Sequence, residues 1–518
     1  MTDQATAISG KRAWAGMALL ALPTVLLGLD VTVLYLVLPA MSADLAPSAT
    51  QTLWAMDAYG FLLAGFLVTM GTLGDRVGRR RLLMVGITAF AAVSVLAAFA
   101  PTPELLIAAR ALLGVAGATL MPSTLSLISN MFADPRQRAV AIGVWATMFA
   151  VGMAAGPVVG GALVDNFWWG AAFLVAVPIA VVVLLLGRVL LPEYRDRRAG
   201  RPDLISVVLS LAAILPIVYA VKHAAVDGID ATAAIAVAGL IAGAVFWRRQ
   251  RRLADPLLDV TLFGDRAFRV ALIVLLIGLV GVGGSMYLVT QYLQLVDGQS
   301  PFEAGLWMGP PALAMFAAGI GAPILARHIR PGHVMGATLG VSLIGYALLA
   351  TAGAGDALPV AAGFAFVYLG LGAIAALGTD IVVGAAPASK SGSAASLSET
   401  VQELGIAIGV AILGSLTTAV YRAQLTVPEG LSDAEAAALA DSLNATVAVA
   451  DGLPAGALED ARLAFTTGMN VAAVVAGLAI AAATVLCLRR LRHLPRLGHE
   501  HTADAGVLDN GPTTLERM

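Results

Sequence analysis

The sequence is poor in charge and in the residues that build disulfides and metal sites. Only 12% of its 518 residues are Asp, Glu, Lys or Arg, and the mean hydropathy is +0.87. The single cysteine, Cys487, excludes an intrachain disulfide, and with six histidines it makes no credible metal cluster. No G-x-x-x-x-G-K-[ST] loop for nucleotide phosphates occurs. These absences argue against a soluble protein and against an enzyme, and we expect no cofactor, no metal and no nucleic-acid partner.

Long apolar runs dominate what is present. A helix that spans a membrane needs about 20 mostly apolar residues, and such runs recur along almost the whole chain. The predicted helices cover 14–39, 51–73, 81–100, 104–131, 138–164, 168–190, 203–223, 231–247, 266–296, 301–326, 333–353, 358–384, 392–420 and 463–488. The expected fold class is therefore an all-α polytopic membrane protein with fourteen spans.

The distribution of basic residues predicts the orientation of these spans. Of the 31 Lys and Arg residues, all but four fall in the two tails, in the loops on the same side, or at the adjoining helix ends. The four others are Lys222, Arg422 and Arg462 on the opposite side and Arg110 inside a helix. Because cytoplasmic loops carry the excess of positive charge, we predict that both termini lie in the cytoplasm.

A weak internal repeat divides the chain. The segment GTLGDRVGRRRLL (71–83) is echoed by GAPILARHIRPGHVM (321–335) at the corresponding place of a second half. Transporters are often built from such repeats, with the substrate site between the halves. The predicted parts are a cytoplasmic N-terminus (1–13), a six-helix bundle (14–190), two additional helices (203–247), a second six-helix bundle (266–488) and a cytoplasmic tail (489–518).

Several motifs resemble those of the major facilitator superfamily. The segment 71–83 is similar to its loop signature, and LDVTVLYLVLP (29–39) resembles the first helix of its fourteen-helix drug:proton antiporters. Arg110 fits the fourth-helix arginine motif, and GMAAGPVVGG (152–161) resembles the fifth-helix antiporter motif. Residues 379–414 are similar to the late helices of the quaternary-ammonium multidrug exporters. One departure is the tenth helix, which lacks the acid that some of these exporters carry.

The resemblance assigns a conformational role to two groups of residues. They are Gly71, Gly74, Asp75, Arg76, Gly78, Arg79 and Arg80 in the loop motif, and Gly152, Gly156, Pro157, Gly160 and Gly161 in the fifth helix. In the family reading, the first group is a cytoplasmic charge latch and the second marks exchangers. The alternatives are an ordinary positively charged inner loop and a stripe of small residues that only permits close helix packing.

Six charged residues lie within the predicted spans, away from both membrane faces. They are Asp30, Asp57, Arg110, Asp380, Glu399 and Glu403. Five ionised acids facing lipid would cost on the order of 12–18 kcal/mol, so each is expected to line a wet cavity, pair with a cation or hold a proton.

Their depth divides these residues into two groups. Asp30, Asp57 and Arg110 fall in the outer part of their helices and form the predicted proton-coupling group, although a purely structural Asp30–Arg110 pair stays open. Asp380, Glu399 and Glu403 fall in the inner half or near the centre, and with Asp57 they are the predicted substrate-binding residues. The two glutamates are four residues apart and therefore share one helix face. Alternatively, they only hydrogen-bond neighbouring helices.

The resemblance, together with the acids inside the spans, implies a proton-coupled multidrug efflux antiporter that works by alternating access in the plasma membrane, as a monomer. The expected partners are protons, the lipid bilayer and lipophilic cations, namely quaternary ammonium compounds and cationic dyes, with fluoroquinolones as further candidates. The alternative is an exporter of an endogenous lipid, peptide or metabolite. The long outer loop 421–462 is either a solvated connector or a lid over the pore.

Overall fold

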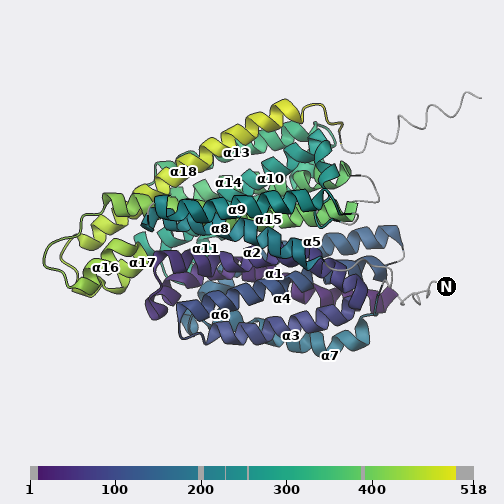
Figure 1. Ribbon diagram of the computed structural model, residues 1–518, viewed down its shortest axis with the longest axis horizontal. Coiled ribbons are helices and arrows are strands. Elements are labelled where there is room, and N and C mark those ends of the chain that lie inside the picture. Colours follow the sequence, from purple (N-terminus) through teal and green to yellow (C-terminus); the bar gives the residue numbers. More distant parts are fainter. Residues whose placement is uncertain are drawn as a thin grey trace, which may run out of the picture.

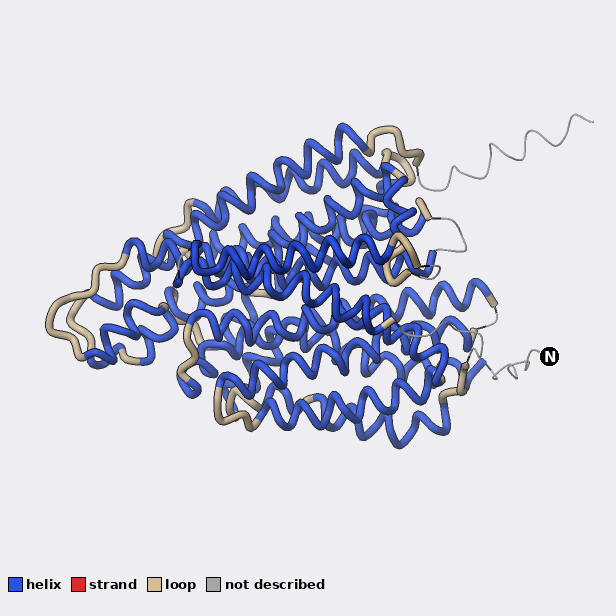
Figure 2. The backbone as a smooth tube through the Cα atoms, viewed as in Figure 1, coloured by secondary structure: helices blue, strands red, loops and turns tan. Residues whose placement is uncertain are grey.

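The computed structural model describes residues 10–132, 134–195, 203–227, 229–253, 256–386 and 391–496. Within these ranges the chain forms helices joined by short loops, with no β-strand (Figure 2). Fourteen of the helical segments are long and apolar enough to cross a membrane, which confirms the predicted number. Residues 1–9 of the predicted N-terminus and 497–518 of the predicted tail lie outside the described residues.

The first half of the chain supplies nine labelled helices. They are α1 (Gly10–Leu45), α2 (Ala49–Val77), α3 (Arg79–Ala98), α4 (Pro103–Met131), α5 (Pro135–Asn166), α6 (Ala171–Leu174), α7 (Ala176–Leu190), α8 (Leu204–Asp227) and α9 (Ile229–Gln250). The short helices α6 and α7 together form the sixth span, and α8 and α9 are the two additional helices.

The second half begins with a short 3-10 turn, η1 (Val260–Gly264). It continues with α10 (Arg266–Gln291), η2 (Tyr292–Val296), α11 (Pro301–Trp307), α12 (Gly309–Ala326), α13 (Pro331–Ala350), α14 (Ala357–Gly384) and α15 (Ser391–Gln424). After α15 come α16 (Asp433–Asp441), α17 (Leu443–Ala448), η4 (Ala450–Gly452) and the last span, α18 (Ala457–Arg490). The predicted long loop therefore carries short helices of its own.

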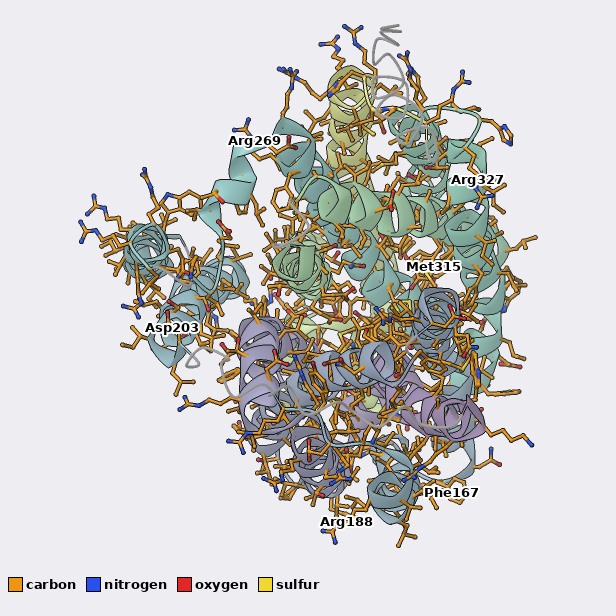
Figure 3. The ribbon with its side chains drawn as sticks, turned by 90° about the vertical axis from the view of Figure 1, so that its right-hand side faces the viewer. Phe167, Arg188, Asp203, Arg269, Met315 and Arg327 are labelled. Atoms are coloured by element: carbon orange, nitrogen blue, oxygen red, sulfur yellow. The ribbon has the colours of Figure 1, made fainter. Side chains whose placement is uncertain are left out.

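The spans pack as two groups with the additional pair beside them. In the N-terminal bundle (α1–α7), α1 packs on α5 and α2 packs on α4; in the C-terminal bundle (α10–α18), α10 packs on α15 and α12 packs on α14. Figure 1 shows the first group in purple and blue below the second in green and yellow. In Figure 3, Asp203, just before α8, lies at the left edge, where α8 and α9 stand beside the two bundles.

The two ends of the molecule differ. One end carries α16 and α17 and is called here the hairpin end; at the other, called the terminal end, α1 begins and α18 finishes (Figure 1). Large apolar side chains are exposed on the outside of the spans, including Leu185, Leu313 and Leu478, each about two-thirds or more exposed. Such a surface is stable in lipid and not in water, so the fold is that of a multi-pass membrane protein.

Candidate functional site

The two bundles are in close contact at the hairpin end. A Cβ atom added to Gly161 of α5 would lie 2.7 Å from Cα of Phe302 in α11, and one added to Gly305 would lie 2.6 Å from the Pro157 oxygen. The Phe302 backbone N–H also donates a hydrogen bond to Asp165 at 3.3 Å. Only glycine permits backbones to approach this closely, and the approach joins the two bundles at this end.

The hairpin itself adds a polar bridge at the same end. Asp441, the last residue of α16, accepts a hydrogen bond from the backbone N–H of Ala49 at the start of α2, at 2.8 Å. Its other carboxylate oxygen accepts from Arg422 of α15 at 3.0 Å. One carboxylate therefore links a helix of each bundle, which a solvated connector would not do.

A cavity lies between the bundles. Helices α1, α5, α10, α12, α14 and α15 all contribute to its wall. The residues are Val31, Thr32, Tyr35, Phe149, Met153, Leu279, Val282, Gly283, Met286, Met315, Tyr368, Leu371, Glu399, Gln402, Glu403 and Ile406. Met315 appears in Figure 3 near the boundary between the two groups of helices. The wall is apolar and aromatic apart from a few polar groups, a composition typical of sites for small molecules.

The paired glutamates are the acidic groups of this wall. Glu399 and Glu403 lie on one face of α15, as their spacing predicted, with Gln402 beside them. Glu403 is buried and Glu399 is half-buried. Neither forms a salt bridge with a basic residue in the part of the chain that the structure describes. The arrangement offers two carboxylates to a cation or proton inside an apolar cavity.

Asp30 and Arg110 form a buried ion pair. The Arg110 Nη1 atom of α4 lies 2.9 Å from the Asp30 Oδ2 atom of α1, and both side chains are buried. The Arg110 Nε–H donates to the Ala55 carbonyl at 3.3 Å, and the guanidinium lies 4.6 Å from the centre of the Tyr59 ring. The predicted meeting of these two residues is thus present, and the Ala55 carbonyl and the Tyr59 ring contact the arginine as well.

Asp57 does not join this pair but has a cation of its own. Its Oδ2 atom lies 2.8 Å from the Nζ atom of Lys222 in α8. The sequence places Lys222 among the charges on the side opposite the termini and does not predict its burial, whereas the structure buries its side chain fully. Lys222 is thus a buried charged residue of the described spans that is not among the six predicted. The one feature of the sequence that could have indicated this burial is a lysine directly after a long apolar run.

Asp380 does not line the central cavity. The predicted substrate-binding group placed it beside the glutamates, but it is exposed near the end of α14. The cause is the rotation of α14, which directs Leu371 and Tyr368 to the cavity and other positions away from it. Periodicity within a single uniformly apolar helix does not reveal this rotation.

The loop motif connects α2, α3 and the segment after α7 at the terminal end. Asp75 pairs with Arg79 at 2.6 Å, and Gly78 between the helices has a φ of 121°, which favours glycine. Glu193 accepts a hydrogen bond from the Arg80 backbone at 3.1 Å, and Arg80 donates to the Leu191 carbonyl. These charged residues thus link α2, α3 and the segment after α7 within the N-terminal bundle. The participation of Glu193 was not predicted.

Other members of this motif pack or pair close by. A Cβ on Gly71 would lie 3.8 Å from Pro122, and one on Gly74 would lie 3.0 Å from Arg79. The backbone carbonyl of Arg76 accepts a hydrogen bond from Arg195 at 2.7 Å.

The glycine stripe of α5 packs on α1. A Cβ atom added to Gly152 would contact Leu29. One added to Gly156 would lie 3.0 Å from the Leu29 oxygen, and one added to Gly160 would lie 2.8 Å from Val33. These glycines therefore allow α5 to pack closely on α1. Gly161 differs, because it faces α11 of the other bundle. The motif therefore combines packing inside one bundle with contact between bundles.

Comparisons with known proteins agree with this architecture. The family model of the Major Facilitator Superfamily matches residues 20–410. The chain is 46% identical to the multidrug efflux pump LfrA of Mycolicibacterium smegmatis over 92% of this chain and 95% of that protein. It is 34% identical to the methyl viologen resistance protein SmvA of Salmonella typhimurium, over 90% and 96% of the two chains.

The similarity extends to a further named exporter and to solved structures. The tetracenomycin C resistance and export protein of Streptomyces glaucescens is 31% identical over 96% of each chain. A bacterial homologue of the human lysosomal transporter Spinster, solved in an inward-facing and unoccupied conformation, shares the fold with a TM-score of 0.65 at 16% identity. That structure aligns with 93% of this chain and 99% of its own.

Proposed function

Since the chain belongs to the major facilitator superfamily, we propose that it is a proton-coupled antiporter that exports lipophilic cations from the cell. Its family and its efflux-pump relatives make it a transporter and not an enzyme. The names of these relatives support export of several drugs. The proposal goes further in naming protons as the driving ion and cations as the preferred substrates, including quaternary ammonium compounds and cationic dyes.

The observation that carries the proposal is the pair of glutamates in the central cavity. Glu399 and Glu403 supply negative charge, and the described residues of the cavity wall include no Lys or Arg. Tyr35, Tyr368 and Phe149 supply aromatic surfaces that attract cations. Methionines such as Met153 and Met315 adapt to different shapes. A lipophilic cation satisfies both the charge and the apolar wall, whereas an anion would find no basic partner there.

Proton coupling follows from competition for the same carboxylates. At about 6 Å between Cβ atoms on one helix face, two ionised glutamates in a cavity of low dielectric repel each other. A bound proton or a bound cation relieves that repulsion, and each therefore opposes the binding of the other. The Asp30–Arg110 pair is a second proton-sensitive element, because protonation of Asp30 would release the guanidinium.

The same proposal assigns an orientation and a setting. The hairpin end would face the outside and the terminal end the cytoplasm, in agreement with the excess of Lys and Arg at the latter. The close contacts at the hairpin end then correspond to a state closed to the outside. The protein would act as a monomer in the plasma membrane.

The first test separates the proton gradient from ATP. Because no nucleotide-binding loop occurs in the sequence, efflux of a lipophilic cationic dye from cells expressing the chain should stop when an uncoupler dissipates the gradient while ATP is maintained. Efflux that continues under the uncoupler and stops on ATP depletion would contradict the antiporter.

The second test concerns recognition. Glu403→Gln should weaken binding of tetraphenylphosphonium by about tenfold, because it removes the buried carboxylate of the cavity. In the parent, binding should weaken as the pH falls from 8 to 6, since protons compete for the site, and in the variant this dependence should flatten. Equilibrium binding to the purified protein measures both effects. Glu429→Gln, which removes an exposed carboxylate of the loop before α16, is the matched control.

An unchanged affinity and an unchanged pH dependence in both Glu399→Gln and Glu403→Gln would remove the basis of the proposal. The glutamates would then only contact neighbouring helices. Export of an endogenous lipid, peptide or metabolite would become the better reading of the fold.

A further inference from the structure

Lys222 sits in a buried site that combines a carboxylate and an aromatic face. Its Nζ atom lies 2.8 Å from Asp57 Oδ2 and 4.1 Å from the centre of the Trp54 ring. The side chains of Lys222 and Asp57 are 0% and 1% exposed. Both Asp57 and Trp54 belong to α2, one turn apart, while the lysine comes from α8. The pair therefore joins an additional helix to the N-terminal bundle.

The location of α8 gives this pair its significance. Helix α8 packs against α2 of the N-terminal bundle and also against α15 of the C-terminal bundle. Phe61 of α2, Val218 of α8 and Ala407 of α15 meet in one buried apolar cluster. Helix α8 thus lies over the seam along which the two bundles touch.

Alternating access changes that seam. When the hairpin end opens, the ends of α2 and α15 there must separate, and the Asp441 bridge between Ala49 and Arg422 must break. A helix packed on both sides of the seam then has to follow one bundle and slide on the other. The ion pair ties α8 to α2, whereas its contact with α15 is apolar and free of hydrogen bonds among the described residues of the cluster.

If α8 only filled space between the two bundles, it would not need a buried ion pair such as Lys222–Asp57. Two charges taken out of water are held less favourably than well-packed apolar side chains of the same size in many proteins. The apolar surroundings at α8, including Ile214 and Leu215, show that this helix is otherwise built in that way. The pair is therefore more than packing requires.

We propose that Lys222 is the positioning residue for Asp57 and that it makes the two additional helices part of the proton-coupling machinery. In the state described here, its ammonium neutralises the Asp57 carboxylate and keeps it from taking a proton. When the hairpin end opens and the seam changes, the pair separates and Asp57 accepts a proton from that side. This inference rests on the proposed proton-coupled function.

The other titratable groups around Asp57 come from the neighbouring helices. Arg110 on α4 acts on it through its charge, and the Asp57 carboxylate acts in turn on the phenols of Tyr35 on α1 and Tyr287 on α10. On α15, the titratable residue Glu403 lies beside α2, with its backbone oxygen 3.6 Å from the Cβ position of Gly60. Among the residues that act on Asp57 in the structure, Lys222 is the one in direct contact.

The test compares coupled and uncoupled transport in the same proteoliposomes. For each variant, uptake of tetraphenylphosphonium driven by a proton gradient is divided by counterflow exchange of the same cation, which needs no gradient. The double variant Asp57→Asn/Lys222→Met removes both charges at once, so no unpaired charge is left buried. We expect the ratio to fall at least tenfold in this variant, and to stay within about threefold of the parent in Lys222→Arg, which keeps the positive charge.

A double variant with the parental ratio would show that the pair only holds α8 in place, and would overturn the inference. The same conclusion would follow if the ratio of gradient-driven uptake to counterflow fell as far in Lys222→Arg as in the double variant, because the positive charge would then not matter. A parent protein without gradient-driven uptake is a different result, since it contradicts the proposed function and not the role of Lys222.

Discussion

Asp30→Asn is expected to abolish proton-driven efflux of every substrate. The asparagine keeps the shape of the side chain and can still accept a hydrogen bond from Arg110 at the 2.9 Å position, but it cannot take up or release a proton. Breaking a buried ion pair on one side commonly costs about 3–5 kcal/mol, and here the isosteric amide, the Ala55 carbonyl and the Tyr59 ring soften that loss. The variant should therefore remain folded but inactive in gradient-driven transport.

Efflux of two unlike substrates, such as a quaternary ammonium compound and a cationic dye, measures this effect. The matched control is Asp44→Asn, since Asp44 lies near the end of the same helix and accepts a hydrogen bond from Trp169 at 2.7 Å. Normal export of both substrates by Asp30→Asn would move the proton site to Asp57 or to the cavity glutamates. The Asp30–Arg110 pair would then be structural.

Gly161→Leu should reduce transport at least tenfold by a different route. A side chain on Gly161 would overlap the backbone of Pro301 and Phe302, and a backbone cannot turn aside as a side chain can. The hairpin end would be unable to close, and the population would shift to a state open at that end. Gly143→Leu is the control, because Gly143 belongs to the same helix and has open space around its Cβ position.

Labelling of cysteines introduced at the hairpin end reports this shift directly. In Gly161→Leu such a cysteine, for example at Thr52, which is buried in the described state, should react faster with a membrane-impermeant maleimide than it does in the parent. Equal labelling rates together with normal transport would show that the contact between α5 and α11 is not needed for the cycle.

The parts of the fold that depend on composition could be predicted from the sequence. Runs of apolar residues determine how many helices cross the membrane, and for this reason fourteen spans were expected and found. The four-residue spacing of Glu399 and Glu403 likewise places both on one face of any helix. The motif at Arg110 indicated a buried charge, and its partner Asp30 was one of few acids at a similar depth.

The parts of the fold that depend on how helices rotate and pair could not be predicted from the sequence. Lys222 follows a long apolar run, at a position equally suited to a membrane face, and only the packing of α8 on α2 brings it to Asp57. Asp380 is at a suitable depth but on the wrong side of α14. Glu193 meets the loop motif because α7 returns beside α3, and nothing in its local sequence indicates that contact.

The contact between α5 and α11 also bears on the entropy of the transport cycle. Gly161, Gly305, Pro157 and Pro301 meet there largely through backbone atoms, and glycine and proline side chains have almost no rotamers to lose. Long side chains would each give up as much as about 1.5–2 kcal/mol of conformational freedom on closure. Closure of the α5–α11 contact therefore costs little side-chain entropy, and opening at this end is opposed instead by polar bonds such as those of Asp441.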